Sequence, residues 1–311
     1  MIEIKNLVKC YGDKRAVNGI SFTVNKGEVL GFLGPNGAGK STTMNIITGY
    51  LSSTSGSVVI NGHDILEEPE LAKKCIGYLP ELPPLYLDMT VVEYLNFMCD
   101  IKGVNKKDRV PQLAKIMAMV KIVDVADRLI KNLSKGYKQR VGIAQAMIGN
   151  PEILILDEPT VGLDPNQIRE IRKLIRKLAT NHTVIISSHI LSEIQAVCDR
   201  VVIINKGKVA AIDSIDDLSG RLSKAKKMLV VFKGDPKLVS NSIRAIPGIG
   251  EVFVRESKSA DYNQVEVTIS SEAEVRTSIF YTMAQINCPI LEMRSLDASL
   301  EDIFLNITQG A

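Results

Sequence analysis

The stretch Gly34-Pro35-Asn36-Gly37-Ala38-Gly39-Lys40-Ser41 decides the fold of this chain. It fits the pattern Gly-x4-Gly-Lys-Ser/Thr, a glycine-rich loop that binds phosphate groups. A strand-like apolar run precedes it at 28–33, and a helix-like segment follows it from Thr42. Glycines allow a tight turn in which successive N–H groups point at phosphate oxygens, and the start of the next helix adds partial positive charge. We therefore predict a nucleotide site at this strand-to-helix junction.

Three side chains at the end of this loop have specific expected roles. Lys40 is expected to hold the terminal phosphates, and Ser41 to present its hydroxyl to a Mg²⁺ ion that bridges them. Thr42 adds a further phosphate contact one position into the helix. The predicted nucleotide-contacting residues of the segment are Gly34, Pro35, Asn36, Gly37, Ala38, Gly39, Lys40, Ser41 and Thr42.

Composition limits the class of protein. With 311 residues the chain is long enough for about two domains. Its formal net charge of +3 is too small to indicate nucleic acid as an obligatory partner. The five cysteines form no Cys-x-x-Cys pair, which favours reduced thiols over disulfides or zinc. No apolar run approaches the roughly 18 residues of a membrane-spanning helix, so we expect the chain not to span a membrane by itself.

The first two thirds of the chain have an α/β pattern. From Ile2 to about Ile212, short apolar runs alternate with segments of helical period, which predicts a largely parallel sheet. The runs 153–156 and 183–186 are typical of strands buried on both faces. We also expect 17–24 and 28–33 to form an antiparallel hairpin through a turn that contains Gly27.

Strand signals vanish between Leu82 and Asn132. Residues 90–101 and 108–121 have helical periodicity, so we predict an all-helical insertion, with a helical subdomain over about 82–149. The basic segment 219–227 then separates the first domain, 1–219, from a second at 228–311, with 220–227 as the linker.

The second domain shows a strand, helix, strand, strand, helix, strand order. This order matches the split βαβ, ferredoxin-like α+β arrangement. The expected elements are 228–232, 236–245, 252–256, 265–269, 272–286 and 290–294, followed by a terminal helix over 299–305 with a capping-box-like start.

Asp157 and Glu158 close the apolar run 153–156. Functional groups collect at the carboxyl ends of strands in open α/β sheets, so both carboxylates should face the same crevice as the phosphate loop. We expect Asp157 to hold Mg²⁺ through its water shell and Glu158 to act as general base on the attacking water. A helix cap or a solvent-facing turn is the alternative interpretation of such a pair.

With these motifs in place, the chain resembles the ATP-binding subunits of ABC transporters over about Ile2 to Ala211. The segment Leu133-Ser134-Lys135-Gly136-Tyr137-Lys138-Gln139-Arg140 is similar to the family signature Leu-Ser-Gly-Gly-Gln-x-Gln-Arg. The resemblance implies that Ser134 and Gly136 cap the γ-phosphate of an ATP held by a second subunit, so that two ATP molecules join a head-to-tail dimer. It also implies a P-loop fold of ABC type, with a mixed sheet, an antiparallel β subdomain and a helical insertion. Lys135 and Tyr137 depart from the family pattern.

The resemblance assigns further residues. His189 stands where the family has its switch histidine, which hydrogen-bonds the γ-phosphate and orients Glu158 and water. His63 and His182 lack such a context, and we expect both in surface loops. Asp164, in a segment similar to the loop through which the subunits sense each other's ATP, could equally cap the next helix.

Two positions stand before and after the phosphate loop. Tyr11 is similar to the aromatic residue that stacks on adenine, although a partly buried strand-end tyrosine is the alternative. Glu81 follows Gly77-Tyr78-Leu79-Pro80 where the family usually has Gln. By resemblance it contacts Mg²⁺ and couples the ATP site to the helical insertion, with altered metal affinity because a carboxylate adds charge and loses the amide donor.

The resemblance implies a separate membrane permease that docks on the helical insertion, near 83–87, and a place at the inner face of the cell membrane. The ending at 299–304 is similar to ATPases of drug-resistance and ABC-2 type exporters with a C-terminal accessory domain. The alternatives are a soluble, non-transport ABC ATPase and a module that binds ATP without hydrolysis. The charged helix 168–178 interleaves basic with apolar residues but has no aromatic residue, so no nucleic acid is expected. Cargo and the choice of homodimer or heterodimer stay open.

Overall fold

The computed structural model describes residues 1–215, 217, 226–255, 262–269 and 275–296. The chain divides into two compact units, the first containing Met1–Ile215 and the second Asp216–Asn306. The predicted terminal helix at 299–305 and residues 220–225 of the predicted linker lie outside the described residues. Over the described part of the chain, no helix combines the length and apolar character needed to cross a bilayer.

A six-stranded sheet forms the centre of the first unit, with strand order β10-β9-β3-β8-β7-β6. Its strands are β3 (Val29–Leu33), β6 (Ile76–Leu79), β7 (Ile153–Asp157), β8 (Thr183–Ser188), β9 (Arg200–Asn205) and β10 (Lys208–Ser214). All neighbours pair in parallel except β9 with β10. Every residue of β3, β7 and β8 is buried, which confirms the prediction of strands covered on both faces.

A second, antiparallel sheet has the order β2-β1-β4-β5. Its strands are β1 (Ile2–Tyr11), β2 (Lys14–Val24), β4 (Ser55–Ile60) and β5 (His63–Asp64). The predicted hairpin between 17–24 and 28–33 is therefore wrong, because β2 pairs with β1 whereas β3 lies between β8 and β9. The burial pattern explains the difference: β2 alternates between buried and exposed residues toward its end, whereas β3 is buried throughout. The turn before β3 thus passes the chain from one sheet to the other, and Gly27 N–H donates to Thr183 Oγ1 at 2.9 Å.

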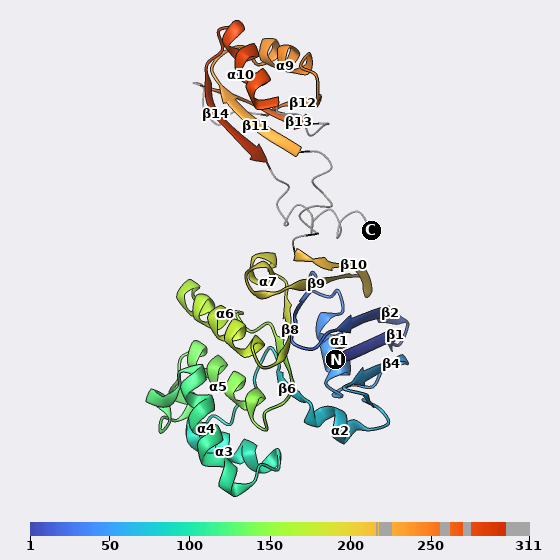
Figure 1. The fold of residues 1–311 in the computed structure, drawn as a ribbon. Helices are drawn as coiled ribbons and strands as arrows, with labels where there is room; N and C mark the ends of the chain where they lie inside the picture. The colour runs from blue at the N-terminus through green and yellow to red at the C-terminus, as the bar shows by residue number, and fades with distance from the viewer. Residues whose placement is uncertain (216, 218–225, 256–261, 270–274, 297–311) are drawn as a thin grey trace. The chain divides into compact units, whose positions relative to one another are not determined.

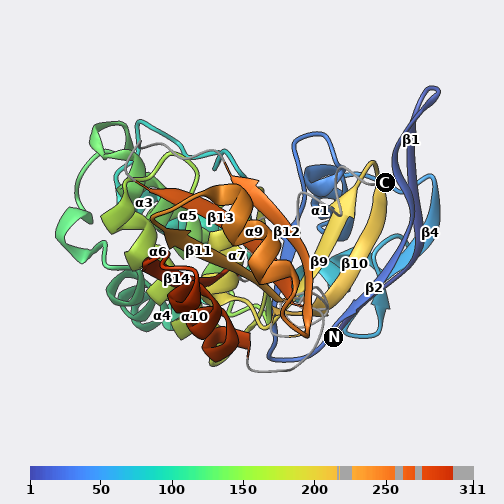
Figure 2. The same ribbon diagram turned by 90° about the horizontal axis from the view of Figure 1, so that it is seen from above.

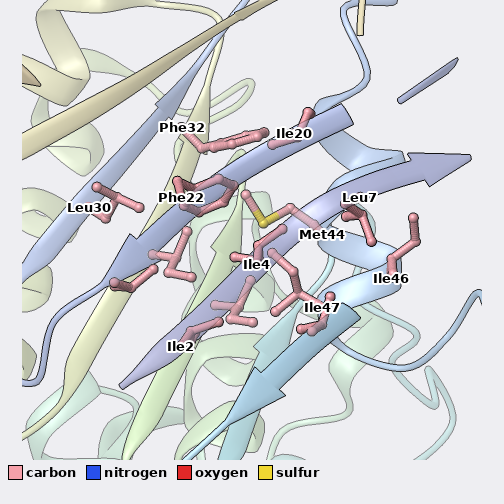
Figure 3. Close-up of a cluster of buried hydrophobic side chains, with 14 of the residues drawn as sticks. Ile2, Ile4, Leu7, Ile20, Phe22, Leu30, Phe32, Met44, Ile46 and Ile47 are labelled. Atoms are coloured by element: carbon pink, nitrogen blue, oxygen red, sulfur yellow. The ribbon is translucent and has the colours of Figure 1, made fainter. Parts of the chain in front are cut away.

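One hydrophobic core joins the two sheets around the helix that follows the phosphate loop, α1 (Lys40–Ile47). Met44, Ile46 and Ile47 of this helix point among residues of both sheets, as Figure 3 shows. Phe22 of β2 and Phe32 of β3 meet in the same core with ring centroids 5.5 Å apart. The helix start that carries the phosphate loop is thereby fixed between the sheets.

The remaining helices of this unit lie on its other parts. They are α2 (Pro69–Lys74), α3 (Val91–Ile101), α4 (Lys106–Val120), α5 (Lys135–Met147), α6 (Pro165–Ala179) and α7 (Leu191–Val197). Both views show α3, α4 and α5 gathered at the end of the unit opposite to β1, β2 and β4 (Figures 1 and 2). Helices α3 and α4 confirm the predicted helical insertion.

The second unit has the predicted ferredoxin-like order. Its elements are β11 (Lys226–Phe232), α9 (Pro236–Arg244), β12 (Ile249–Arg255), β13 (Asn263–Ile269), α10 (Val275–Gln285) and β14 (Ile290–Leu296). The strands form an antiparallel sheet with order β12-β13-β11-β14. Val239 and Ile243 of α9 and Ile279 and Met283 of α10 share a core with Val230 of the central strand. The two helices therefore pack on one face of this sheet (Figure 1).

Candidate functional site

Three parallel strands end at the same edge of the central sheet. Leu33 of β3 lies opposite Ser188 of β8, and Asp157 of β7 lies opposite Ser187. The phosphate loop directly follows β3, Glu158 follows β7, and His189 follows β8. The register alone therefore brings the three predicted motifs to one place, as expected at the carboxyl edge of an open α/β sheet.

The phosphate loop closes around its own lysine. Lys40 Nζ donates to the carbonyl oxygen of Gly34 at 2.8 Å and lies 3.4 Å from that of Pro35. Gly39 has φ 106, and a Cβ there would lie 2.5 Å from the carbonyl oxygen of Ala16. Only glycine fits this conformation and this close approach. Helix α1 starts directly afterwards, so its first N–H groups are available to an anion.

Glu158 has an unusual backbone conformation for a non-glycine residue, with φ 47. Its N–H donates to both oxygens of Ser187, at 3.2 Å to the carbonyl and 3.1 Å to the hydroxyl. The Ser187 hydroxyl itself donates to the Asp157 carboxylate. Such left-handed conformations persist where surrounding contacts fix them, often at functional sites. Here they direct the Glu158 side chain toward the phosphate loop.

The Glu158 carboxylate meets two partners. Its Oε2 lies 2.9 Å from His189 Nδ1 and its Oε1 lies 3.8 Å from Lys40 Nζ. Glu158 and Lys40 are buried, with 7% of each side chain exposed, whereas 40% of His189 is exposed. A carboxylate, an imidazole and an ammonium group thus converge where the terminal phosphate of a nucleotide would be held.

Burial dominates the electrostatics of this site. It lowers the pKa of Lys40, although the charges of Glu158 and Asp157 oppose that change. It raises the pKa of Asp157 against the hydrogen bond from Ser187, and it raises the pKa of Glu158 against the hydrogen bond and charge of His189. A carboxylate with a raised pKa is a stronger base, which suits proton abstraction from water.

Two neighbouring cavities contain most of the predicted residues. One of about 380 Å³ is lined by Tyr11, Lys14, Ala16, Asn36, Gly37, Gly39, Lys40, Ser41, Thr42, Glu81, Glu158, Val161 and His189. The other, of about 840 Å³, includes Ser41, Glu81 and Asp157 in its lining. Ser41 and Glu81 line both cavities, so the three predicted Mg²⁺ ligands border one space. A hydroxyl and two carboxylates are the oxygen donors that Mg²⁺ prefers, and the residues present fit this ion.

Tyr11 lies at the open side of the smaller cavity. Its side chain is 49% exposed, and Lys9 Nζ lies 5.5 Å from its ring centroid. An exposed ring at the rim of this cavity can receive a flat base by stacking. Tyr11 is also the last residue of β1 and is about half covered, so the alternative of a partly buried strand-end tyrosine fits it as well, and adenine stacking stays a prediction.

Ser134, Gly136 and Asp164 do not line the cavity of their own chain. Ser134 caps α5 and its hydroxyl accepts from Tyr137 N–H at 3.4 Å. Asp164 caps α6 through Asn166 and Gln167 N–H, at 2.9 and 3.0 Å, which confirms the capping alternative. The starts of the two helices are neighbours, because a Cβ on Gly136 would lie 2.7 Å from the side chain of Gln167.

The two departures from the family signature have structural partners. Tyr137 donates its hydroxyl to Asp124 at 2.7 Å, and this hydrogen bond raises the pKa of the phenol. Lys135 Nζ lies over the Gly162 backbone, where an added Cβ would be only 2.0 Å away. Tyr137 thus contacts the helical insertion, and Lys135 contacts the loop before Asp164.

Sequence patterns missed several features of the site. Lys14 and Ala16 line the smaller cavity but belong to no motif. Ser187, which binds Asp157 and the Glu158 backbone, is evident only from the strand register. The prediction of a surface position for His182 is wrong: the residue is buried and its Nδ1 lies 2.7 Å from the carbonyl oxygen of Pro151. The imidazole can be buried at this position because the Pro151 carbonyl oxygen provides a hydrogen-bond partner for its Nδ1.

Comparisons with known proteins agree with this geometry. Residues 17–161 match the family model described as ABC transporter. The chain is 34% identical over 309 residues to the linearmycin resistance ATP-binding protein LnrL of Bacillus subtilis, covering 99% of this chain and 98% of that protein. It is 40% identical over 223 residues to the bacitracin transport ATP-binding protein BcrA of Bacillus licheniformis, covering 71% and 72%.

Solved structures give the same result. An ATP-binding subunit of an ABC transporter superposes with a TM-score of 0.66 at 30% identity, over 72% of this chain and 93% of that one. A dimeric, post-hydrolysis ATP-binding cassette with bound ADP and Pi has a TM-score of 0.63 at 26% identity, over 69% and 99%. These relatives support the transporter interpretation rather than the non-transport alternative. The chain belongs to the ATP-binding proteins of ABC transporters, and it is an ATPase of that family.

Proposed function

We propose that this chain is the energy-supplying subunit of an ABC exporter that removes antimicrobial compounds from the cell. The observation that carries the proposal is the Glu158 carboxylate, held 2.9 Å from His189 Nδ1 and 3.8 Å from Lys40 Nζ beside the phosphate loop. The names of the linearmycin resistance and bacitracin transport relatives support the cargo class.

The phosphate loop and α1 bind the triphosphate. When the triphosphate binds, the buried Lys40 ammonium group leaves its present carbonyl partners. It then donates a charge-assisted hydrogen bond to the terminal phosphates. Tyr11 stacks on the adenine. Ser41, Asp157 and Glu81 would hold Mg²⁺, directly or through its water shell, and the bound ion would supply positive charge beside the phosphates.

Glu158 is the general base of hydrolysis. It accepts a proton from the attacking water as the water oxygen bonds to the γ-phosphorus and the bond from that phosphorus to the ADP oxygen breaks. His189 contacts Glu158 and holds the γ-phosphate by hydrogen bonding. The burial that raises the pKa of Glu158 supports this role, because it strengthens the carboxylate as a base.

Ser134 and Gly136 serve the ATP site of a second subunit. Ser134 begins α5, so free N–H groups and the helix dipole face outward at a place that does not line the cavity of its own chain. Asp164, at the start of α6 beside them, belongs to the contact between the subunits. The dimeric ATP-binding cassette among the solved relatives supports the association of two subunits.

A separate permease docks in the cavity of about 840 Å³, placing the chain at the cytoplasmic face of the membrane. Its lining combines Ser41 and Glu81, which we propose as Mg²⁺ ligands, with Tyr50, Leu82 and Pro84. Tyr50 and Leu82 are 78% and 82% exposed, so apolar surface is available to a partner helix. Glu81 thus connects the docking site with the metal.

Capture of the chain from membranes tests this proposal. A tagged copy is isolated from native membranes in mild detergent, with a Leu82→Asp variant to disrupt the docking surface and Leu238→Asp, in the other unit, as the control. We expect one polytopic membrane protein in near-equal amount with the wild type and the control, and a strong loss with Leu82→Asp. Recovery of soluble partners alone would contradict the transporter role. The cargo class is tested by susceptibility of the deletion strain to linearmycin and bacitracin, and unchanged susceptibility would contradict it.

A further inference from the structure

A buried carboxylate beside the site has no role in the chemistry described above. Glu193 lies in the first turn of α7 and is 7% exposed. One oxygen, Oε2, accepts two hydrogen bonds, from Thr160 Oγ1 at 2.5 Å and from Ser188 Oγ at 3.0 Å. Within the described residues its hydrogen-bond partners are hydroxyl groups rather than cations. Burying a carboxylate is costly unless such bonds satisfy it, so the arrangement requires both hydroxyls.

The two hydroxyls lie next to the reacting groups, one in the loop after β7 and the other at the end of β8. Thr160 stands two residues after Glu158, and Ser188 directly precedes His189. Ser188 Oγ also accepts Ile190 N–H at 3.0 Å, which fixes the loop on the far side of His189. Glu193 therefore connects the segment that carries Glu158 to the segment that carries His189. The Glu158 carboxylate and His189 Nδ1 themselves lie 2.9 Å apart.

We infer that Glu193 is a positioning residue for hydrolysis: by binding Thr160 and Ser188 together it fixes the distance between Glu158 and His189. The inference rests on the proposed role of Glu158 as the base. Small errors in the placement of reacting groups are expensive, since about 1 Å can change a rate by roughly 100-fold. Nucleotide binding depends on the phosphate loop and Tyr11, which do not contact Glu193, and so remains intact without it.

The competing explanation is that Glu193 only stabilises the start of α7. The two roles differ in the kinetic constant that they affect. A positioning role lowers kcat and leaves the KM for ATP unchanged, because the lost interaction matters in the transition state. A purely structural role lowers the melting temperature and reduces kcat in proportion to the fraction of protein that is unfolded.

The experiment measures ATP hydrolysis and binding of a fluorescent ATP analogue by the full chain. Glu193→Ala is expected to lower kcat by at least about 10-fold with KM within roughly twofold. Glu193→Gln is expected to stay within about threefold of the wild type, because one amide oxygen can accept both hydrogen bonds. Gln195→Ala, an exposed position on the same helix, is the matched control and should resemble the wild type.

Thr160→Val keeps the inference testable if Glu193→Ala does not fold. This substitution removes one of the two hydroxyls and should lower kcat. The double variant Glu193→Ala, Thr160→Val should be no slower than Glu193→Ala alone, because the two residues act as a unit. Unchanged kcat in Glu193→Ala or Thr160→Val, or a parallel loss of kcat and analogue binding, would overturn the inference. Glu158→Gln distinguishes failure of the proposed base from failure of the positioning role. If Glu158→Gln retains activity, the proposed base is wrong. If Glu158→Gln is inactive and Glu193→Ala is fully active, only the positioning role is refuted.

Discussion

Replacement of Gly77 by alanine tests how the nucleotide site is connected to the signature helix. Gly77 lies in β6, where the strand packs directly on α5. A Cβ there would lie 2.0 Å from the carbonyl oxygen of Ala146 and 2.8 Å from Leu154 Cδ2. An ordinary contact begins at 3.4 Å, so the strand and the helix must separate by about 1.4 Å.

The expected cost is at the upper end for overpacking, because the blocking atom belongs to the backbone and cannot rotate away. We expect a loss of about 2–3 kcal/mol in the free energy of unfolding, or roughly 4–12 °C in Tm. Function should suffer further, since β6 leads to Glu81 and α5 begins at Ser134. Separating them displaces Ser134 from the position in which we propose that it faces the ATP of a second subunit, while the phosphate loop before α1 stays in place.

The assay combines thermal unfolding, binding of a fluorescent ATP analogue and ATP hydrolysis. Gly77→Ala should have a lower Tm and a lower kcat than the wild type, while its affinity for the ATP analogue stays within about threefold of the wild-type value. Gly250→Ala is the matched control in the other unit, where the nearest atom, Thr268 O, would be 3.3 Å from the new Cβ. A Gly77→Ala protein with the stability and activity of the wild type would refute the argument that β6 and α5 are in fixed contact.

Three further predictions follow from the site. Glu81→Gln removes a negative charge and restores an amide donor, so the Mg²⁺ concentration for half-maximal hydrolysis should rise; unchanged Mg²⁺ dependence and rate in both Glu81→Gln and Glu81→Ala would exclude the proposed role. Because burial raises the pKa of Glu158 and the base must be ionised, kcat should fall as the pH drops through a value above the ordinary glutamate pKa of about 4.3; a pH–rate profile with its acid limb at or below that value would contradict the burial argument. At Gly162 an alanine side chain would meet a positive φ of 69 and the Lys135 ammonium group, so Gly162→Ala should lower the free energy of unfolding by about 1–2 kcal/mol and slow hydrolysis. Replacing Lys135 by alanine as well should recover part of the loss. Equal thermal stability of Gly162→Ala and wild type would contradict this prediction.

Local sequence patterns were sufficient where a motif and its secondary structure coincide. The phosphate loop predicts a strand before it and a helix after it, and β3 and α1 confirm both. The carboxylates Asp157 and Glu158 were predicted from a buried strand that ends with them, and the parallel register then places them beside the loop.

Long-range pairing could not be obtained in the same way. The turn before β3 has the composition of a hairpin, yet β2 and β3 join different sheets, because β2 pairs with β1 directly before it whereas β3 pairs with β8 and β9 far along the chain. His182 shows the same limit, since its carbonyl partner belongs to Pro151, which is remote in sequence. Glu193 carries no motif, and only the fold shows that Thr160 and Ser188 meet on it.

The most direct test of the account is the association state of Glu158→Gln in ATP and Mg²⁺, measured by size-exclusion chromatography with light scattering. Without its base the protein should bind ATP but not hydrolyse it, so two copies should remain joined through Ser134 and Gly136. We expect a dimer with ATP, a monomer without nucleotide or with ADP, and loss of the ATP-dependent dimer when Ser134→Arg is added. Continued hydrolysis, or a monomer at saturating ATP, would contradict the central claim that Glu158 is the base of an ATP-joined dimer.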